Sequence, residues 1–349
     1  MKRMLVLGII LSAIVLVLPT MLVLMGSSNE EVLQTDNIVE ASTEKEQSHE
    51  SEEVVLEKTS ADDVMVTVFR TEKNEVEEIK LEEYVMGVVG SEMNASFEME
   101  ALKAQALAAR TFILQYMMNE EVTKTPEGAL ITDTGATHQV YQDKTQLQEK
   151  WGEQFDEYYR KIEEAVLSTK GEIITYGEKP IDASYFSTSN GYTENSEDYW
   201  ENKLPYLRSV ESPWDQESPR FTGQTTISVE DFEAKLNVEL PNDGSVGTIV
   251  SRTNSGRVET ANINGKELSG KVIRESLSLD SADFQWQRQG NEVIVQTKGW
   301  GHGVGMSQYG ANGMALEGKS YKEIVHHYYQ DVKIETTAPF IKQYVANRS

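Results

Sequence analysis

An uninterrupted apolar segment, residues 4–25, stands near the start of this 349-residue chain. It contains no charged residue, and as a helix it is long enough to cross a hydrocarbon layer of about 30 Å. Lys2 and Arg3 precede it, so the positive-inside rule predicts that residues 1–3 lie in the cytoplasm and that the rest of the chain lies outside. A cleaved signal peptide is the alternative, although its apolar core is shorter and ends in a small-x-small site. We therefore expect a single retained transmembrane helix at residues 4–25 of a cell-membrane protein.

The next segment is strongly acidic. Residues 29–63 hold twelve acidic residues against two lysines and contain no aromatic residue. A segment of this composition cannot bury a core and repels itself, which predicts a disordered stalk over residues 26–63. Residues 64–349 remain as one folded domain.

Composition excludes several functions for that domain. The net charge of the chain is −25, which argues against nucleic acid or anionic lipid as the main partner. The chain has no cysteine, so it has no disulfide, no thiolate nucleophile and no cysteine-ligated metal.

A carboxylate stands on an apolar helical stripe at residues 81–92. Apolar residues recur at helical spacing from residue 81 to residue 89, and one more turn of the same face reaches Glu92. Glu82 and Glu83 fall on the solvent side. A second amphipathic helix follows the break at residues 94–96.

Two interpretations of Glu92 remain open at this point. It could form an ion pair with Lys103 or Arg110, which lie seven residues apart along the edge of the second helix. It could instead be a general acid, because a helix C-terminus and apolar neighbours both raise the pKa of a carboxyl group. A glutamic acid that is still protonated near neutral pH suits protonation of a leaving oxygen.

The middle of the chain offers polar and aromatic candidates. Residues 151–170 are predicted as a helix, and Tyr185 and Ser187 alternate along a strand that enters a turn at Ser189. These side chains could bind a polar ligand or form a hydroxyl-rich structural turn. Trp200 and Trp214 could stack on sugar rings or fill a core. Residues 227–290 predict two helices and strands with Asn-Ser-Gly and Asn-Gly hairpin turns, as a scaffold or a second lobe.

Residues 297–320 are rich in glycine and lie between a predicted strand (291–298) and a predicted helix (320–332). Residues 313–320 match the phosphate-loop pattern G-x-x-x-x-G-K-[ST]. The match is interpreted as accidental, because it does not follow its strand directly, contains the helix-forming sequence Met-Ala-Leu-Glu and lies outside the membrane, where ATP is scarce.

His302 is the histidine of this glycine-rich stretch. Together with His138 and a carboxylate it could ligate zinc. Alternatively, the glycines allow positive φ angles and present His302, Ser307 and Gln308 at the rim of a cleft. The second interpretation is the one that we prefer.

Five segments together point to a family. The sequences "LEEYVMGVVGSEM", "EALKAQALAARTF", "YFSTSNGYTENSEDYW", "LPYLRSV" and "GWGHGVGMSQYGANGMA" occur in this order, and residues 65–335 resemble the stage II sporulation protein D (SpoIID) family. The resemblance implies a lytic transglycosylase that acts on peptidoglycan glycan strands without stem peptides, during engulfment of the forespore. It also implies a mixed α+β fold, for which we expect two lobes around a glycan-binding cleft.

The resemblance also implies roles for individual residues. Glu92 matches the family's catalytic glutamate, which would protonate the oxygen between N-acetylmuramic acid and N-acetylglucosamine and then help to close a 1,6-anhydro ring. The residues in matching motifs that we expect to contact the glycan are Lys103, Arg110, Tyr185, Ser187, Ser189, His302 and Gln308.

The implied partners are a cell-wall amidase/endopeptidase and a multi-spanning membrane protein, and no cofactor is expected. Some relatives bind zinc partly through cysteines, which this chain lacks, so we expect no metal. The alternative function is a glycan-binding scaffold with little activity of its own that recruits or stimulates a partner amidase.

Overall fold

The structure is a computed structural model that describes residues 64–118, 125–135 and 138–346. The proposed transmembrane helix (4–25) and stalk (26–63) lie outside these residues, and both stay predictions. Within the described ranges, no helix combines the length and the apolar composition needed to cross a membrane.

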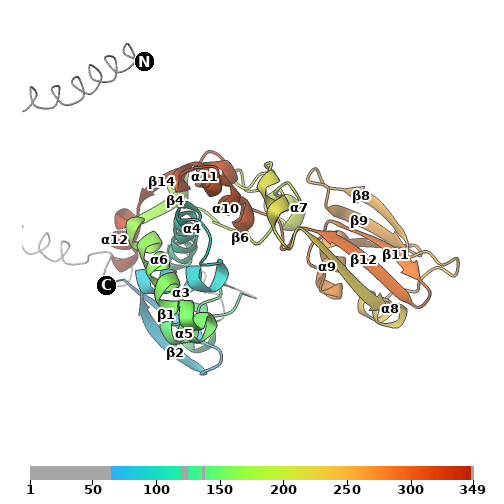
Figure 1. The fold of residues 1–349 in the computed structure, drawn as a ribbon, viewed down its shortest axis with the longest axis horizontal. Coiled ribbons are helices and arrows are strands. Elements are labelled where there is room, and N and C mark those ends of the chain that lie inside the picture. The colour runs from blue at the N-terminus through green and yellow to red at the C-terminus, as the bar shows by residue number, and fades with distance from the viewer. Residues whose placement is uncertain (1–63, 119–124, 136–137, 347–349) are drawn as a thin grey trace, which may run out of the picture. The chain divides into compact units, whose positions relative to one another are not determined.

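The described chain is a mixed α+β fold, as the sequence predicted, and its elements are shown in Figure 1. The strands are β1 (Met65–Arg70), β2 (Glu75–Lys80), β3 (Ile131–Thr132), β4 (Glu172–Tyr176), β5 (Lys179–Pro180), β6 (Tyr185–Phe186), β7 (Thr222–Ser228), β8 (Thr248–Arg252), β9 (Val258–Ile263), β10 (Lys266–Ser269), β11 (Phe284–Gln289), β12 (Glu292–Lys298), β13 (Met306–Ser307) and β14 (Lys333–Thr336). The α-helices are α3 (Leu81–Glu92), α4 (Met99–Met118), α5 (Lys144–Trp151), α6 (Phe155–Ser168), α7 (Ser196–Tyr199), α8 (Val229–Leu236), α9 (Gly270–Leu277), α10 (Gln308–Leu316), α11 (Tyr321–Tyr328) and α12 (Ala338–Ala346).

The strands form small sheets rather than one large sheet. Their orders are β2-β1-β3, β14-β4-β5, β13-β6, β10-β9-β8 and β11-β12-β7. The β1–β3 and β6–β13 pairs are parallel, and the other pairs are antiparallel.

The larger hydrophobic core surrounds helix α4. This helix contacts α3, α6, α10, α11 and β4, and all of its alanines are buried. Alanine favours the helix and has no bulky side chain, so neighbouring helices can approach closely on several sides. Helix α4 is therefore the central element against which α3, the helix that ends at Glu92, is packed.

A second, smaller core belongs to residues 222–298. It lies among sheet β11-β12-β7, sheet β10-β9-β8 and helices α8 and α9. The Phe284 and Trp286 rings have centroids 5.1 Å apart, and the Trp286 and Phe232 rings meet edge to face at 5.9 Å. The two predicted hairpin turns, at 253–256 and 264–265, connect β8 to β9 and β9 to β10.

Two predicted elements differ from the structure. The expected helix over 151–170 is interrupted, because Gly152 takes a positive φ of 54° at the end of α5, and the long helix α6 begins at Phe155. The strand expected to lead into the turn at Ser189 is reduced to Tyr185–Phe186, because its partner β13 is equally short.

Candidate active site

Glu92 lies at the last position of helix α3, on the wall of a cavity of about 970 Å³. The helix ends there because the next residue, Met93, is extended, with φ −114° and ψ 149°. The polar and aromatic side chains on the cavity wall include Glu92, Gln139, Tyr185, Ser187, Tyr199, Trp200, Arg220, Lys271, Glu275, Trp300, His302 and Gln308.

The carboxyl group of Glu92 is held by hydrogen bonds. The Val140 backbone N–H donates to Oε1 over 2.7 Å, and the Tyr185 side chain also bonds this carboxyl group. Burial raises the pKa of Glu92, while these two hydrogen bonds and the positive charge of Lys150 partly oppose the rise. The net effect favours the protonated acid.

A chain of hydrogen bonds fixes the direction of the Tyr185 hydroxyl. The Tyr84 hydroxyl donates to Gln139 Oε1 over 3.1 Å, and Gln139 Nε2 donates to the Tyr185 hydroxyl oxygen over 3.1 Å. The Tyr185 hydroxyl can accept from Gln139 and donate its own proton to the Glu92 carboxyl group at the same time. Burial also raises the pKa of Tyr185 well above its ordinary value, so the phenol remains a donor.

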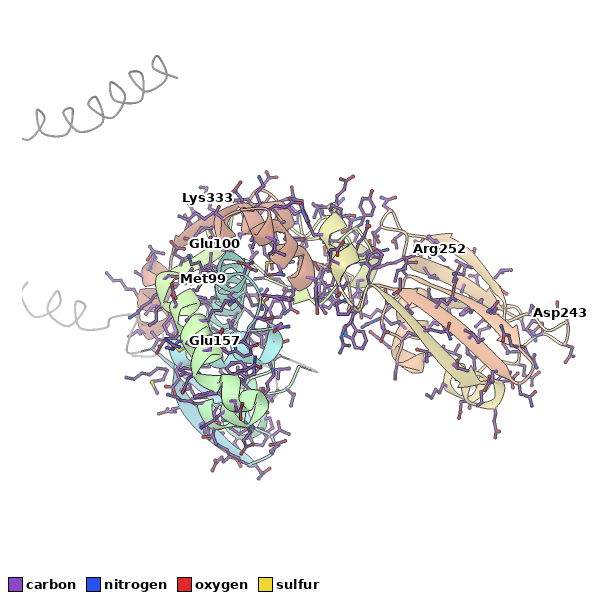
Figure 2. The ribbon with its side chains drawn as sticks, viewed as in Figure 1. Met99, Glu100, Glu157, Asp243, Arg252 and Lys333 are labelled. Atoms are coloured by element: carbon purple, nitrogen blue, oxygen red, sulfur yellow. The ribbon has the colours of Figure 1, made fainter. Side chains whose placement is uncertain are left out.

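The alternative ion pairs of Glu92 are not formed. Lys103 instead bonds Glu100 over 2.7 Å in the first turn of α4, and Figure 2 labels Glu100. Arg110 is fully buried and bonds Glu82 over 2.7 Å. The interpretation of Glu92 as one member of either pair is therefore wrong.

Three expected glycan-contact residues do not line the cavity. Lys103 is in its pair with Glu100, and Arg110 also donates to the carbonyls of Val166 and Glu172, so its guanidinium is occupied inside the core. Ser189 is buried and bonds Asp215 through its N–H and its hydroxyl, over 2.9 and 2.8 Å.

The solvent-side position predicted for Glu82 is wrong. Only 9 % of Glu82 is exposed, because the guanidinium of Arg110 draws this carboxylate into the interface between α3 and α4. The helical stripe could not reveal this, since the partner comes from another helix.

The other expected contact residues, Tyr185, Ser187, His302 and Gln308, do line the cavity. Gln308 Nε2 donates to the backbone carbonyl of Glu92 over 3.1 Å, which joins the start of α10 to the end of α3. Residues that are 216 positions apart in the sequence are thereby brought to one site.

His302 is packed among aromatic rings. Its ring lies 5.2 Å from Trp200 and 5.7 Å from both Phe186 and Tyr199, between centroids. Burial lowers the pKa of His302 to about 3, so the imidazole is neutral. The Val304 N–H donates to Nδ1 over 3.1 Å, which places the proton of the neutral ring on Nε2.

The glycine-rich segment brings this histidine close to strand β6. Gly299, Gly301, Gly303 and Gly305 all have positive φ angles. A Cβ atom on Gly305 would lie 2.0 Å from the Ser184 carbonyl oxygen, so no other residue fits without displacing the backbone. The predicted close approach of the backbone and the rim positions of His302 and Gln308 are confirmed, whereas the rim position predicted for Ser307 is wrong, because its buried hydroxyl bonds Asp215 and caps α10.

The phosphate-loop match is accidental, as expected. Residues 313–316 belong to helix α10, and Gly313 packs against Trp214. Lys319 pairs with Glu323 over 3.3 Å, and Ser320 is the N-cap of α11. A helical segment cannot wrap its amides around a phosphate.

A zinc site receives no support from the described residues. Within them, no group of three or more histidine, cysteine or carboxylate side chains could hold a metal ion. The expectation of no metal stays a prediction.

Sequence reasoning missed several residues of the cavity wall. Trp200 lines the cavity, whereas Trp214 packs against His327 with ring centroids 5.4 Å apart. The residues that no motif indicated are Gln139, Arg220, Lys271 and Glu275, while Trp300 stands in the glycine-rich motif but was not predicted as a contact. Lys271 and Glu275 lie on the same face of α9, four residues apart, but this spacing is common on solvated helices and gives no signal by itself.

Comparisons with known proteins identify the family of this chain. The family model described as "SpoIID: Stage II sporulation protein" matches residues 70–176. The chain is 47 % identical over 342 residues to Stage II sporulation protein D of Bacillus subtilis (strain 168), covering 97 % of each chain. It is also 47 % identical over 344 residues to the protein of that name from Bacillus amyloliquefaciens, again covering 97 % of each.

A more distant relative carries a different name. The chain is 28 % identical over 302 residues to the Amidase enhancer of Bacillus subtilis (strain 168), covering 70 % of this chain and 39 % of that protein. Together with the two full-length matches, the family model shows that the chain belongs to the SpoIID family of stage II sporulation proteins.

Proposed function

We propose that this chain is a lytic transglycosylase of peptidoglycan, with Glu92 as its general acid and base. The substrate would be peptide-free glycan strands, and the products would end in 1,6-anhydro-N-acetylmuramic acid. The observation that supports this proposal best is the protonation-favouring environment of Glu92 on the wall of a large cavity.

The cavity also fits a sugar polymer chemically. Tyr199, Trp200 and Trp300 provide aromatic faces, while Ser187 and Gln308 provide a hydroxyl and an amide. Aromatic rings offer flat apolar surfaces, and hydroxyl and amide groups both donate and accept hydrogen bonds. Arg220 and Lys271 supply positive charge for the lactyl carboxylates that peptide removal leaves on the muramic acid units.

One residue can carry both proton transfers. Protonated Glu92 gives its proton to the glycosidic oxygen as the bond from C1 of N-acetylmuramic acid to that oxygen breaks. The resulting carboxylate takes the proton of the C6 hydroxyl of the same sugar, and the C6 oxygen bonds to C1. Glu92 is protonated again, and no water is consumed.

The test is product analysis with the purified full-length chain and peptide-free glycan strands. We expect anhydro ends by mass spectrometry and a loss of rate of about 10²–10⁴-fold in Glu92→Gln, the usual contribution of a general acid. A hydrolase would give ends heavier by the mass of one water.

Glu275 gives this test a second arm. It lines the same cavity and accepts a hydrogen bond from Tyr199 over 3.1 Å. A hydrolytic mechanism requires two carboxyl groups. If the native chain gives water-containing products and Glu275→Gln has no activity, a hydrolase mechanism replaces the proposed reaction.

A second function, stimulation of an amidase, is favoured by the similarity to the Amidase enhancer. In that case the chain would bind strands without cleaving them and would raise the rate of a partner cell-wall amidase/endopeptidase. Intact strands after incubation, together with a faster amidase that is unaffected by Glu92→Gln, would support this alternative.

The proposal includes the location of the protein in the membrane. Residues 4–25 would anchor the chain in the membrane with residues 1–3 in the cytoplasm and residues 64–349 outside, during forespore engulfment, beside a multi-spanning membrane protein. Alkaline extraction of membranes would retain the full-length chain and release a chain that lacks residues 1–28.

A further inference from the structure

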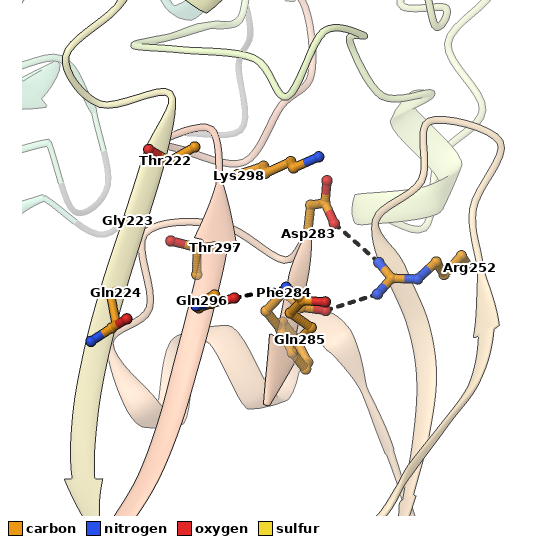
Figure 3. A pocket seen from close by; sticks show the side chains of 10 residues that line it. All are labelled: Thr222, Gly223, Gln224, Arg252, Asp283, Phe284, Gln285, Gln296, Thr297 and Lys298. Atoms are coloured by element: carbon orange, nitrogen blue, oxygen red, sulfur yellow. Dashed lines mark hydrogen bonds and ion pairs between the residues drawn. The ribbon is translucent and has the colours of Figure 1, made fainter. Parts of the chain in front are cut away.

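A separate cavity of about 620 Å³ lies on sheet β11-β12-β7, outside the candidate active site (Figure 3). Its wall includes Thr222 and Gln224 of β7, Gln285 of β11, and Gln296, Thr297 and Lys298 of β12. The proposed reaction uses none of these residues.

Three glutamines form a row across the sheet. In the strand register Gln285 is opposite Gln296, and Gln296 is opposite Gln224, so the three side chains lie on one face. All three are exposed. Gln285 Nε2 donates to Gln296 Oε1 over 2.8 Å, and each amide retains further donor and acceptor capacity.

The row continues along the strands. A smaller cavity of about 240 Å³ shares Gln285 and Gln296 with the first and adds Gln287 and Ile294. The shared residues make the two hollows neighbours on one sheet face, and an extended polymer could follow them.

This face differs in charge from the rest of the chain. The net charge of the chain is −25, yet the outward positions of 222–226, 285–287 and 294–298 contain no carboxylate. Asp283, at the end of the row, is paired with Arg252 over 3.0 Å, as Figure 3 shows. Amides, hydroxyls and the ammonium of Lys298 suit a ligand rich in hydroxyl and acetamido groups that carries scattered negative charge.

Thr297, next to Gln296 on β12, points to the opposite face of the sheet from the three glutamines, because successive side chains of a strand alternate. It lines the larger cavity, is only 3 % exposed, and its Oγ1 has no hydrogen-bond partner in the described part of the chain. A buried hydroxyl without a partner costs free energy. A Cβ atom on Gly223 would lie 2.7 Å from this Oγ1 and 2.5 Å from Asp280 Oδ2, so only glycine fits between the hydroxyl and this carboxylate.

The sheet face is also connected to the candidate active site through the backbone. Strand β7 begins two residues after Arg220, and β12 ends two residues before Trp300. Arg220 and Trp300 line the catalytic cavity and contact one another, with the guanidinium carbon 3.8 Å from the ring centroid.

We propose that the glutamine face of sheet β11-β12-β7 is an accessory binding site for a further stretch of the glycan strand whose cleaved bond is at Glu92. The ligand class is an N-acetylated hexosamine polymer, and the site would give the protein a preference for long strands. This inference rests on the proposed function.

The test compares long and short glycans with full-length protein that carries Glu92→Gln, so that binding is measured without cleavage. Gln296→Glu is added to this variant, because it preserves the acceptor that Gln285 uses, removes one donor and introduces a charge that repels lactyl carboxylates. The matched control is Gln289→Glu, which adds the same charge on the same sheet face outside both cavities.

We expect Gln296→Glu to weaken binding of long peptide-free strands by about tenfold, the effect of losing one or two hydrogen bonds. Binding of a tetrasaccharide, which occupies the catalytic cavity alone, should not change, and Gln289→Glu should bind both as the parent does. Equal binding of long strands by Glu92→Gln alone and by its combinations with Gln296→Glu and Gln289→Glu would overturn the accessory site.

Failure of the proposed function has a different signature. If the protein with native Glu92 leaves long strands and tetrasaccharide intact, and neither ligand binds to Glu92→Gln, the catalytic proposal fails and the accessory site fails with it. Cleavage with native Glu92, together with length-independent binding, removes the accessory site only.

Discussion

Opposing effects set the pKa of the Glu92 carboxyl group. Burial raises its pKa, and the Val140 N–H, the Tyr185 hydroxyl and Lys150 lower it. Each influence comes from a different segment of the chain, so each can be removed separately. The acid form is the active form for the first proton transfer, and the rate should fall as pH rises through this raised pKa.

Tyr185→Phe should move that alkaline limb to higher pH. The hydroxyl stabilises the ionised carboxylate, so its removal raises the pKa of Glu92 further, and the acid stays protonated over a wider range. The measurement is the pH profile of kcat/KM on peptide-free strands. Tyr192→Phe, at an exposed tyrosine outside the cavity, should leave the profile unchanged. A shift of the limb to lower pH would contradict the direction of this hydrogen bond.

Arg110→Met should destabilise the protein by about 3–5 kcal/mol, because it leaves the Glu82 carboxylate in the core without its partner. Lys103→Met removes a partly exposed pair with Glu100 and should cost less than about 1 kcal/mol. Urea denaturation of both variants checks the contrast. An Arg110→Met protein of normal stability that no longer binds glycan would restore the sugar-contact role predicted from the sequence.

At the scale of elements, the glycine-rich segment allows the backbone of 299–305 to lie in direct contact with the segment around β6. Gly299, Gly301 and Gly305 lie against Thr188, Phe186 and Ser184, at distances that leave no room for a side chain at these three glycines. This contact fixes His302 on one side and strand β6, with Tyr185, on the other. The glycines thus act on the site through position rather than through chemistry of their own.

Gly305→Ala should destabilise the protein by more than about 2 kcal/mol, since the residue has a φ of +81° and its Cβ would lie 2.0 Å from the Ser184 carbonyl oxygen. Gly318→Ala is the matched control: its φ is +84°, but no atom lies within 4 Å of the added Cβ. Only the backbone strain of about 1–2 kcal/mol should remain there. Equal thermal shifts for the two variants would show that close approach has no energetic role.

The comparison of sequence with structure is also clearest for single elements. Helical periodicity predicted the position of Glu92 on α3 correctly, because this position depends only on neighbouring residues of the same helix. It misplaced Glu82, because a partner 28 residues away decides where that carboxylate lies. Gln139 and Glu275 could not be predicted at all, since they reach the cavity through tertiary contacts and belong to no pattern. Gly152 interrupts a helix whose amphipathic period continues on both sides of the interruption, so the pattern hid the break.

At the scale of the whole described molecule, polar contacts link the two hydrophobic cores. Asn190 Nδ2 donates to the Ser255 carbonyl and to Asp283 Oδ2, both over 2.9 Å. Buried Glu194 accepts hydrogen bonds from Ser255 and Thr253. The cavity wall includes Lys271 and Glu275 of α9, a helix whose buried face packs in the second core, so these links bear on the site as well as on the fold.

Asn190→Ala should therefore lower both stability and substrate binding. Two acceptors lose a donor, which costs about 1–3 kcal/mol, and the α9 residues that line the cavity lose one of their connections to the rest of the wall. We expect a lower thermal midpoint and a raised KM with a smaller change in kcat. Asn242→Ala, at an exposed asparagine, serves as control. A raised KM without any loss of stability would instead indicate direct contact between Asn190 and the glycan.

The neutral state of His302 has a practical consequence. Because its pKa is lowered to about 3, the imidazole of His302 stays neutral and in one tautomer near neutral pH. Its ring resonances in an NMR spectrum should thus be insensitive to buffer pH and sensitive to whatever enters among Phe186, Tyr199 and Trp200. The His302 ring resonances can therefore report ligand binding in the cavity without an added label. The titration of Glu92 should not change the charge of this ring.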